Sequence, residues 1–403
     1  MKEKSHMLII KMFLVFFLFG CMNTNILPTA NLTPTLQARS STQTLPPMLP
    51  PATFTKTPFS TVSKIPTIAI AGKDYGTIFL VNPDIGTPQQ LDISGDTAVN
   101  VLGWVENGCS LYVETEKQRV LKLNISGNLV AELADIDSLN LDAAITKITI
   151  SPDEQWIALI LGTGNQGFSS YEFQNLVTVS LQNSKEIYKV TEDSVVTDSS
   201  WKFDSGMIAF TDKDNNNIQQ IFVTSPSGSN RTQLTHLNMT DLTIRSLKWS
   251  PNGEAIAFVI VDEEKHESTL GIVETGDTNN LIVTASVIGV NEFFWLSNDR
   301  IMANVLPIGK DSTKLGDRAI AWFDSDTGQE LGRISPENLP IEVFQLPGSL
   351  ANSDQIGFFA HTNFYVYDTS SLQLEKGFDI FTDMRYWVSA PIAIESEDCK
   401  ILE

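Results

Sequence analysis

The sequence predicts an all-β repeat fold over residues 65–403, and three observations support this prediction. A short apolar run followed by a turn recurs along the chain, with anchor positions 46, 51, 48 and 46 residues apart. Each turn leads into consecutive apolar residues, which suits a strand covered on both faces. Runs rich in Gly, Ser, Asp and Asn separate these strands and favour tight hairpins. A period of about 40 to 50 residues built from short strands is typical of repeat architectures.

The five clear copies share an anchor residue that is tryptophan in all but one of them. These anchors are Trp104, Ile150, Trp201, Trp249 and Trp295. After the fourth anchor the chain reads Ser250-Pro251-Asn252-Gly253, in which Pro presets φ and Gly accepts the positive φ that closes such a turn. Weaker copies follow at 346–349 and 387–390. Because the tryptophans recur at one place in each repeat, we expect them to pack between neighbouring sheets.

Four antiparallel strands in each repeat describe one blade of a β-propeller. The first segment, 67–92, has outer strands but no inner strand before it, and Tyr386–Val388 supplies one. The C-terminal strand is therefore expected to complete the N-terminal blade and close the ring, which removes exposed sheet edges. The 339 residues of 65–403 give about 48 per blade for seven blades, whereas six would need about 56 and eight about 42. The sequence predicts seven blades, with six or eight as alternatives.

Three of the copies resemble TolB-type, WD-like propeller repeats. The matching stretches are Trp201–Leu234, Trp249–Phe258 and Ile150–Asp153. The resemblance extends over 65–403 in period but over about three blades in motif, and it implies a fold more than an activity. TolB-like blades also occur in front of peptidase domains, but a G-x-S-x-G motif is absent here, which disfavours a serine peptidase.

Residues 1–21 predict an export signal. Basic residues precede an apolar stretch whose uninterrupted run, Met12–Gly20, is about half the length that a membrane-spanning helix needs. The end of this stretch, Leu18-Phe19-Gly20-Cys21, resembles the bacterial lipobox and implies a diacylglycerol on the Cys21 thiol, although Phe19 is bulkier than usual. An ordinary secretory signal is the alternative. We therefore expect an exported protein of the cell envelope that meets the membrane through its lipid anchor only.

Residues 22–64 predict a disordered Thr/Pro-rich linker. They contain ten Thr and seven Pro, and Arg39, Lys56 and Lys64 are the only charged residues. Such a composition favours extended, solvated backbone. Residues 1–64 hold six of the 27 basic and one of the 48 acidic residues, which leaves 21 and 47 in 65–403, a formal net charge of −26. A domain of this charge repels phosphate backbones, so nucleic acid is not expected as a partner.

One segment has the spacing of a calcium-binding loop. Asp212, Asp214 and Asn216 place oxygen ligands at alternate positions, but the distant bidentate Glu is missing, so the tip of a polar hairpin is the leading interpretation. Gly162–Gly167 matches G-x-G-x-x-G without a helix after it, and no cofactor is predicted. The histidines outside the signal, His236, His266 and His361, share no metal-ligand spacing.

No catalytic residues can be assigned from the sequence. An acidic pair could serve a glycosidase, but the sequence does not show which of the many carboxylates approach one another. Cys109 and Cys399 are available for a disulfide in an exported chain, and whether they pair stays open. The leading hypothesis is a non-catalytic binding or assembly module for an envelope protein or glycan. An exported glycan hydrolase or lyase is the alternative, and a solute-sensing or structural envelope component without its own ligand is a third hypothesis.

Overall fold

The computed structural model describes most of the predicted repeat region. The described residues are 53–54, 68–72, 78–81, 89–91, 93, 96–105, 109–163, 173–182, 186–238, 240–276, 281–284, 287–290, 293–307, 318–335, 348–349, 355–360, 363–368, 373–379 and 384–389. All described residues lie in one compact unit, 46–403. The predicted signal and its Cys21 lie outside the described residues.

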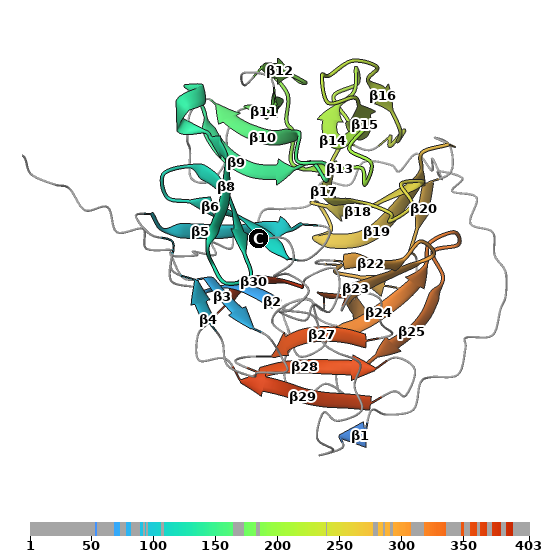
Figure 1. Cartoon of the computed structure of the whole chain (residues 1–403). Coiled ribbons are helices and arrows are strands. Elements are labelled where there is room, and N and C mark those ends of the chain that lie inside the picture. Colours follow the sequence, from blue (N-terminus) through green and yellow to red (C-terminus); the bar gives the residue numbers. More distant parts are fainter. Residues whose placement is uncertain are drawn as a thin grey trace, which may run out of the picture. The chain divides into compact units, whose positions relative to one another are not determined.

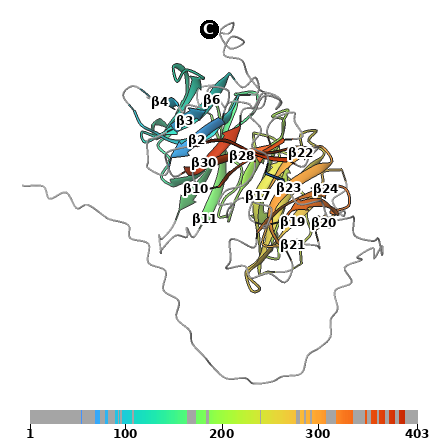
Figure 2. The ribbon, with the colours of Figure 1, turned by 90° about the horizontal axis from the view of Figure 1, so that it is seen from below.

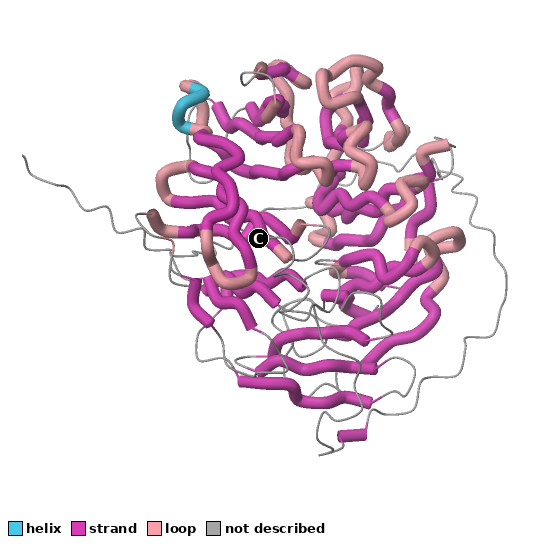
Figure 3. The backbone as a smooth tube through the Cα atoms, in the orientation of Figure 1, coloured by secondary structure: helices cyan, strands magenta, loops and turns pink. Residues whose placement is uncertain are grey.

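The described strands form seven sheets of four or five strands each (Figures 1 and 3). Four sheets consist of consecutive strands: β5 (Ala98–Trp104), β6 (Ser110–Thr115), β7 (Arg119–Asn124) and β8 (Leu129–Asp135); β9 (Ala144–Ile150), β10 (Trp156–Thr163), β11 (Phe173–Ser180) and β12 (Ile187–Lys189); β13 (Ser199–Trp201), β14 (Ile208–Lys213), β15 (Gln219–Thr224) and β16 (Thr232–Gln233); β17 (Leu242–Trp249), β18 (Ala255–Asp262), β19 (Glu267–Glu274) and β20 (Leu281–Val283).

The remaining three sheets use strands that are separated further along the chain or that pair in a less regular order. They comprise β21 (Val287–Ile288), β22 (Phe293–Ser297), β23 (Arg300–Pro307), β24 (Ala319–Asp324) and β25 (Glu330–Ile334); β26 (Gly348–Ser349), β27 (Gln355–Ala360), β28 (Asn363–Asp368) and β29 (Gln373–Asp379) with β1 (Thr53–Phe54); and β2 (Ile68–Gly72), β3 (Ile78–Val81) and β4 (Gln89–Leu91) with β30 (Met384–Ser389). The strand pairs are antiparallel except β1 and β29, which are parallel.

The second strand of each well-described sheet is covered on both faces, as the runs of consecutive apolar residues predicted. All side chains from Ile157 to Ile160 in β10 and from Ile256 to Val259 in β18 are buried. The cores lie between neighbouring sheets: one cluster joins Ile221 of β15 to Ile244 of β17. In a strand with one exposed face, apolar and polar residues would alternate. Here neighbouring sheets cover both faces, so consecutive residues are apolar.

The strands at one end of each sheet contact one another in series. These lead strands are β5, β9, β13, β17, β22, β26 and β30, and each contacts the next in this order. The last of them, β30, also contacts β5. The contacts therefore return to the sheet from which they start.

The C-terminal strand belongs to the N-terminal sheet, as the sequence predicted. In Figures 1 and 2, β30 lies beside β2, and the antiparallel register places Ile68 opposite Ser389 and Ile70 opposite Trp387. The strand order is β30-β2-β3-β4. Residues more than 300 positions apart in the sequence thus form one sheet.

Two residues of the predicted linker are in a strand. Thr53 and Phe54 form β1 and pair with Gln373 and Leu374 at the start of β29. At these two positions the chain adds a fifth strand to a sheet instead of forming part of the expected disordered linker. The rest of 22–64 lies outside the described residues.

Helical structure is confined, in the described residues, to one 3₁₀ turn, η1 (Asp137–Leu139), which is cyan in Figure 3. No helix in the described part of the chain is both long enough and apolar enough to span a bilayer.

Cys109, directly before β6, is disulfide-bonded. The other cysteines, Cys21 and Cys399, lie outside the described residues. We expect Cys399 to be the partner, because lipidation would occupy the Cys21 thiol. Cys109→Ser and Cys399→Ser should each remove the same linked peptide from a non-reducing peptide map and lower the free energy of unfolding by about 2–4 kcal/mol. A linked peptide that persists in Cys399→Ser would assign the bond to Cys21.

Candidate functional site

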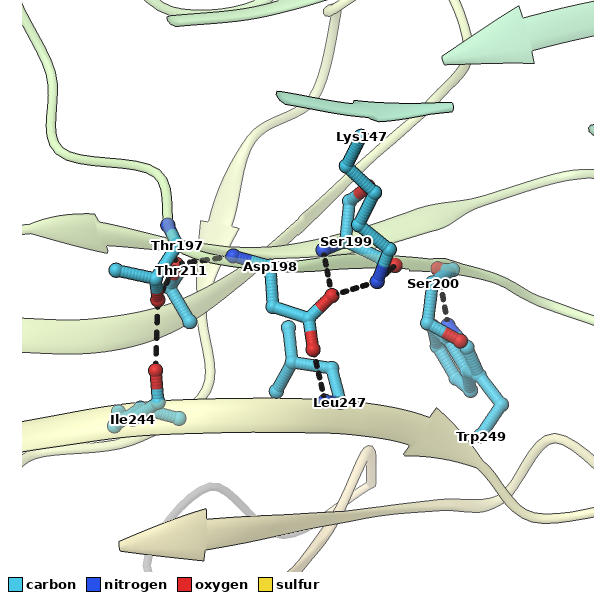
Figure 4. A network of polar contacts seen from close by, with 9 residues as sticks. All are labelled: Lys147, Thr197, Asp198, Ser199, Ser200, Thr211, Ile244, Leu247 and Trp249. Carbon is cyan, nitrogen blue, oxygen red and sulfur yellow. Dashed lines mark hydrogen bonds and ion pairs between the residues drawn. The ribbon is translucent and has the colours of Figure 1, made fainter. Parts of the chain in front are cut away.

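The best-defined polar cluster lies on three successive lead strands. We call it the lead-strand network; it consists of Lys147 on β9, Thr197 to Ser200 at the start of β13, Thr211 on β14, and Ile244, Leu247 and Trp249 on β17 (Figure 4). The side chains and backbone groups of these residues connect three sheets by hydrogen bonds. The free edge of a terminal strand carries unpaired N–H and C=O groups, and this network uses several of them.

The carboxylate of Asp198 is the centre of the network. Its Oδ1 accepts hydrogen bonds from the Lys147 ammonium and from the Ser199 backbone N–H (2.7 Å), and its Oδ2 accepts one from the Leu247 backbone N–H (2.8 Å). The residue is 6% exposed. A buried carboxylate needs such donors to offset its lost hydration, and here they come from all three sheets.

A bulge in β17 makes the Leu247 amide available to Asp198. Between Arg245 and Lys248 the register shifts, so that two residues of β17 lie opposite one residue of β18. Ser246, inside the bulge, has a φ of 58°. A bulge of this kind leaves the extra residue outside the ladder, which frees the Leu247 N–H for a partner on another sheet.

A second group of contacts connects β17 to the sheet before it. The Thr197 hydroxyl donates to the Ile244 carbonyl (2.7 Å), and the Ile244 N–H donates to Gln219 Oε1 (2.5 Å). The Thr211 hydroxyl accepts a hydrogen bond from the Thr197 N–H (2.8 Å). Both backbone groups of Ile244 are thus satisfied by side chains from the preceding sheet.

The repeated tryptophans bind the lead strand of the preceding sheet. In three copies the indole Nε1–H donates to a backbone carbonyl there: Trp201 to Thr149 (3.4 Å), Trp249 to Ser200 (2.9 Å) and Trp295 to Lys248 (3.0 Å). Trp201 and Trp249 are each 8% exposed and belong to cores between sheets. The prediction that these residues pack between sheets is confirmed at both positions.

Some polar groups in and beside the lead-strand network still have hydrogen-bonding capacity. In the described part of the chain, the hydroxyls Thr149 Oγ1 and Ser199 Oγ are buried and have no hydrogen-bond partner. Among the same residues the Lys147 ammonium donates to Asp198 and to the Ser199 carbonyl (3.3 Å), which leaves one of its three N–H groups. The two hydroxyls are buried away from any ligand, and the Asp198 carboxylate is already engaged from three directions.

The turn after each anchor contacts the preceding sheet. The fourth residue after the anchor has a positive φ in three copies: 58° at Glu154, 59° at Ser205 and 69° at Gly253. The Ser205 hydroxyl accepts a hydrogen bond from the Asp153 N–H (2.9 Å). A Cβ at Gly253 would lie 2.4 Å from Lys202 Cε and 2.9 Å from Phe203 Cε1, so space favours glycine there, whereas Glu154 and Ser205 adopt the same positive φ in the equivalent turns.

Glu154 extends this contact into a partly buried polar group. Its carboxylate forms an ion pair with Lys122 of β7 (2.7 Å) and accepts a hydrogen bond from the hydroxyl of Tyr112 on β6. Burial, together with this hydrogen bond and the charge of Glu154, raises the pKa of the Tyr112 hydroxyl above its ordinary value. The phenol therefore stays protonated and serves as a donor that joins two sheets.

Asp96 and Arg119 form another ion pair, and it predicts a pH dependence of stability. Arg119 Nε donates to Asp96 Oδ2 (2.8 Å). Burial opposes ionisation of Asp96, but hydrogen bonds from Thr115 and Arg119 outweigh it and hold its pKa below the ordinary 3.8. A lowered pKa stabilises the fold above the pKa of the unfolded chain, and this contribution is lost as the pH falls through the folded-state pKa.

The test compares Asp96→Asn with the unaltered protein. We expect the variant to be less stable above about pH 5, by a margin that narrows as the pH falls below about 4. Urea unfolding at a series of pH values measures this margin, since all other titrating groups are shared. A margin independent of pH would show that the Asp96 charge does not contribute.

Asp212 and Asp214, two of the predicted calcium-type residues, are engaged by hydrogen bonds from protein groups. Asp212 is 4% exposed, and its Oδ2 accepts hydrogen bonds from Arg231 (2.8 Å) and Ser194 (3.2 Å). Asp214 Oδ1 accepts the backbone N–H of Asn216 (2.8 Å), which shapes the turn. No group of three His, Cys, Asp or Glu side chains in the described part of the chain could hold a metal ion.

The other candidate site residues from the sequence lie apart from the lead-strand network. Gly162 and Thr163 end β10, and the rest of 162–167 is outside the described residues. His236 contacts Gln233 through Nδ1 (3.2 Å), beside β16. The sequence analysis missed Asp198, which the structure shows to be the central group of the network.

Comparisons with known proteins show similarity at the level of structure. No family model matches the sequence, and no curated protein sequence is significantly similar. An oligogalacturonate lyase from Vibrio parahaemolyticus is 12% identical, with a TM-score of 0.51 over 72% of this chain and 87% of that one. An oligogalacturonate lyase in complex with manganese is 11% identical, with a TM-score of 0.52 over 78% and 82%. TolB from Acinetobacter baumannii is 13% identical, with a TM-score of 0.43 over 81% and 67%.

The sheets and the two lyase structures define the fold class. The chain is an all-β protein with repeated antiparallel sheets and the β-propeller fold, similar to that of oligogalacturonate lyases. At 11–12% identity this similarity concerns the fold alone.

Proposed function

We propose that the chain is a closed propeller of seven blades, one for each sheet. Two observations support this proposal. The lead strands contact one another in an unbroken series that runs from β5 to β30 and back to β5. The pairing of β30 with β2 joins the two ends of the repeat region in one sheet. Both are expected of sheets arranged in a closed ring, in which every sheet has a neighbour on each side.

We propose further that this propeller is a non-catalytic binding or assembly module for a protein or glycan at the cell envelope, with protein as the preferred partner. The observation that carries this proposal is the exposure of large apolar side chains: Leu129, Val130 and Phe203 are 57%, 54% and 55% exposed. Leu129 and Val130 are adjacent on one strand, and apolar side chains exposed side by side, unlike single scattered ones, are typical of surfaces that bind other proteins.

The proposed cellular location of the module is based on the lipobox-like end of the predicted signal. We propose that Cys21 carries the lipid, that residues 22–64 act as the tether, and that the protein is exported and attached to a membrane only through this lipid. Metabolic labelling with a radioactive fatty acid tests the anchor. Label should appear in the native chain and be absent from Cys21→Ser; equal labelling of both would overturn this part of the proposal.

The binding function is tested with the full-length protein, tagged at its C-terminus and captured from detergent-solubilised envelopes. The same preparation is applied to a glycan array. We expect saturable binding of an envelope protein that survives washing and is absent with an unrelated lipoprotein carrying the same tag. Recovery of neither a protein nor a glycan would contradict the proposal.

The alternative is an exported glycan hydrolase or lyase. The fold similarity to oligogalacturonate lyases and the partly exposed ammonium of Lys147 favour this candidate. Incubation of the same protein with oligogalacturonate and a panel of envelope glycans, followed by mass spectrometry of the products, distinguishes it. New cleavage products that disappear in Lys147→Met would replace the binding proposal by the enzymatic one.

A further inference from the structure

We propose that the outer edge of β8 is the docking site for a short, extended, basic peptide segment of a partner protein, which adds to the sheet as a further strand. This inference rests on the proposed protein-binding function and names its surface. Addition of a strand supplies main-chain hydrogen bonds, while side chains next to the edge select the sequence.

The length of β8 distinguishes it from most of the other outer strands. It has seven residues, whereas β4, β12, β16 and β20 have two or three and β25 has five. β29 also has seven residues, and its outer side is covered by β1. β8 has no strand on its outer side among the described residues. Natural sheets blunt their edges by keeping them short, by covering them, or with charges and bulges; β8 is long and uncovered in the described structure, so it offers main-chain groups to an added strand.

The side chains of β8 add apolar surface to this open edge. Leu129 and Val130 are the first two residues of the strand, and both are more than half exposed. Val130 is the extra residue of a bulge, because Leu129 pairs with Leu123 and Ala131 with Lys122, so an added strand would meet two adjacent apolar side chains at the start of this edge. The outer strands β12 and β20 each expose one such side chain, Ile187 and Val283, at 40%.

The charge around β8 selects a basic segment. Glu132 on the strand and Asp137 after it are exposed, and residues 65–403 carry the formal net charge of −26. The ion pair of Glu132 with Arg119 (3.2 Å) is itself exposed to solvent, so a partner cation can compete for it. Charge complementarity of this kind steers a basic peptide to the edge.

Two features favour a peptide over a second copy of this chain. The register shifts twice between β7 and β8, and a short single segment can follow the twist that such bulges give to an edge, whereas the edge of a second rigid sheet cannot. Glu132 is the central residue of β8, so antiparallel pairing of two copies would place like charges opposite each other. The pairing of Thr53–Phe54 with β29 shows that an outer edge of this fold accepts a short extended segment.

The test uses a fluorescent, end-capped peptide in which Lys alternates with Val and Thr, titrated with the full-length protein and followed by anisotropy. We expect saturable binding that weakens with salt. The same peptide with alternate backbone amides methylated should bind at least tenfold more weakly, because methylation removes strand pairing and keeps the charge. A peptide with Glu in place of Lys should also bind at least tenfold more weakly.

The double variant Leu129→Lys and Val130→Lys should reduce binding at least tenfold, whereas the matched control Ile187→Lys and Val283→Lys, on other outer strands, should leave it unchanged. Equal binding by the wild type and the β8 variant, or by the methylated peptide, would overturn the proposal. A dimer that forms without peptide binding and is lost in the β8 variant would overturn it in favour of a second copy.

The same variants separate this inference from the binding function. If the β8 variant still captures the envelope protein that the wild type captures, the binding function stands and β8 is not its site. If wild type and variants capture nothing and bind no peptide, both proposals are overturned. Loss of capture in the β8 variant alone, together with the peptide results above, supports both.

Discussion

Replacement of Asp198 by alanine is expected to lower the free energy of unfolding by about 2–5 kcal/mol. The substitution removes the acceptor of three hydrogen bonds, from Lys147, Ser199 and Leu247. The ammonium of Lys147 is partly exposed and can regain water. The two backbone amides bind a carboxylate that is almost fully withdrawn from solvent, so little water can take its place when it is removed. Buried donors that lose their acceptor account for most of the expected cost.

Urea unfolding of the purified variant measures this cost. Glu263→Ala is the matched control, because Glu263 pairs with Arg245 (2.9 Å) while both side chains are half exposed or more. Such surface pairs contribute about 0–1 kcal/mol, so the control should stay within that range. Asp198→Asn retains one acceptor oxygen and should fall between the two. A loss below about 1 kcal/mol in Asp198→Ala would show that the network does not hold the three sheets together.

Much of the fold could be predicted because its determinants are local and repeated. The turn at Ser250–Gly253 and the apolar run that follows it specify a hairpin with both faces covered, and the structure shows both. The missing first strand before 67–92 predicted that the C-terminal strand would join this sheet, and β30 pairs with β2. Because the pattern occurs in several copies, sequence change in a single copy does not prevent the repeat from being recognised.

The central residue of the candidate site could not be found in this way. Asp198 lies in a polar run, Thr197-Asp198-Ser199-Ser200, that resembles an ordinary loop. Its partners are about one repeat away on either side, at Lys147 and Leu247. A signal was nevertheless present: Lys147 and Asp198 each lie three residues before an anchor, so alignment of the repeats places opposite charges at one position of adjacent sheets.

The proposed docking edge was hidden for a different reason. Leu129 and Val130 look like part of any apolar strand, and only the sheet order shows that nothing described covers β8. The length of an outer strand depends on its pairing with the strand inside it, and hydrophobic periodicity does not determine where that pairing ends. Exposure of an apolar pair is therefore a property of the assembled sheet.

Trp249→Ala is expected to lower the free energy of unfolding by about 3–5 kcal/mol, the range typical of large aromatic side chains removed from a core. The side chain is 8% exposed and packs in the cluster that joins the sheets of β15 and β17. It also donates its indole N–H to the Ser200 carbonyl on β13 (2.9 Å). Packing and hydrogen bonding thus act on the same boundary between two sheets.

Trp249→Phe separates the two contributions, because phenylalanine keeps an aromatic ring and lacks the N–H donor. We expect it to lose clearly less stability than Trp249→Ala, since most of the indole's effect comes from buried apolar area. Phe203→Ala, at a ring that is 55% exposed, is the control and should change stability by less than about 1 kcal/mol. Equal losses in the two Trp249 variants would mean that the hydrogen bond to the preceding lead strand, and not the packing of the ring, holds these sheets in register.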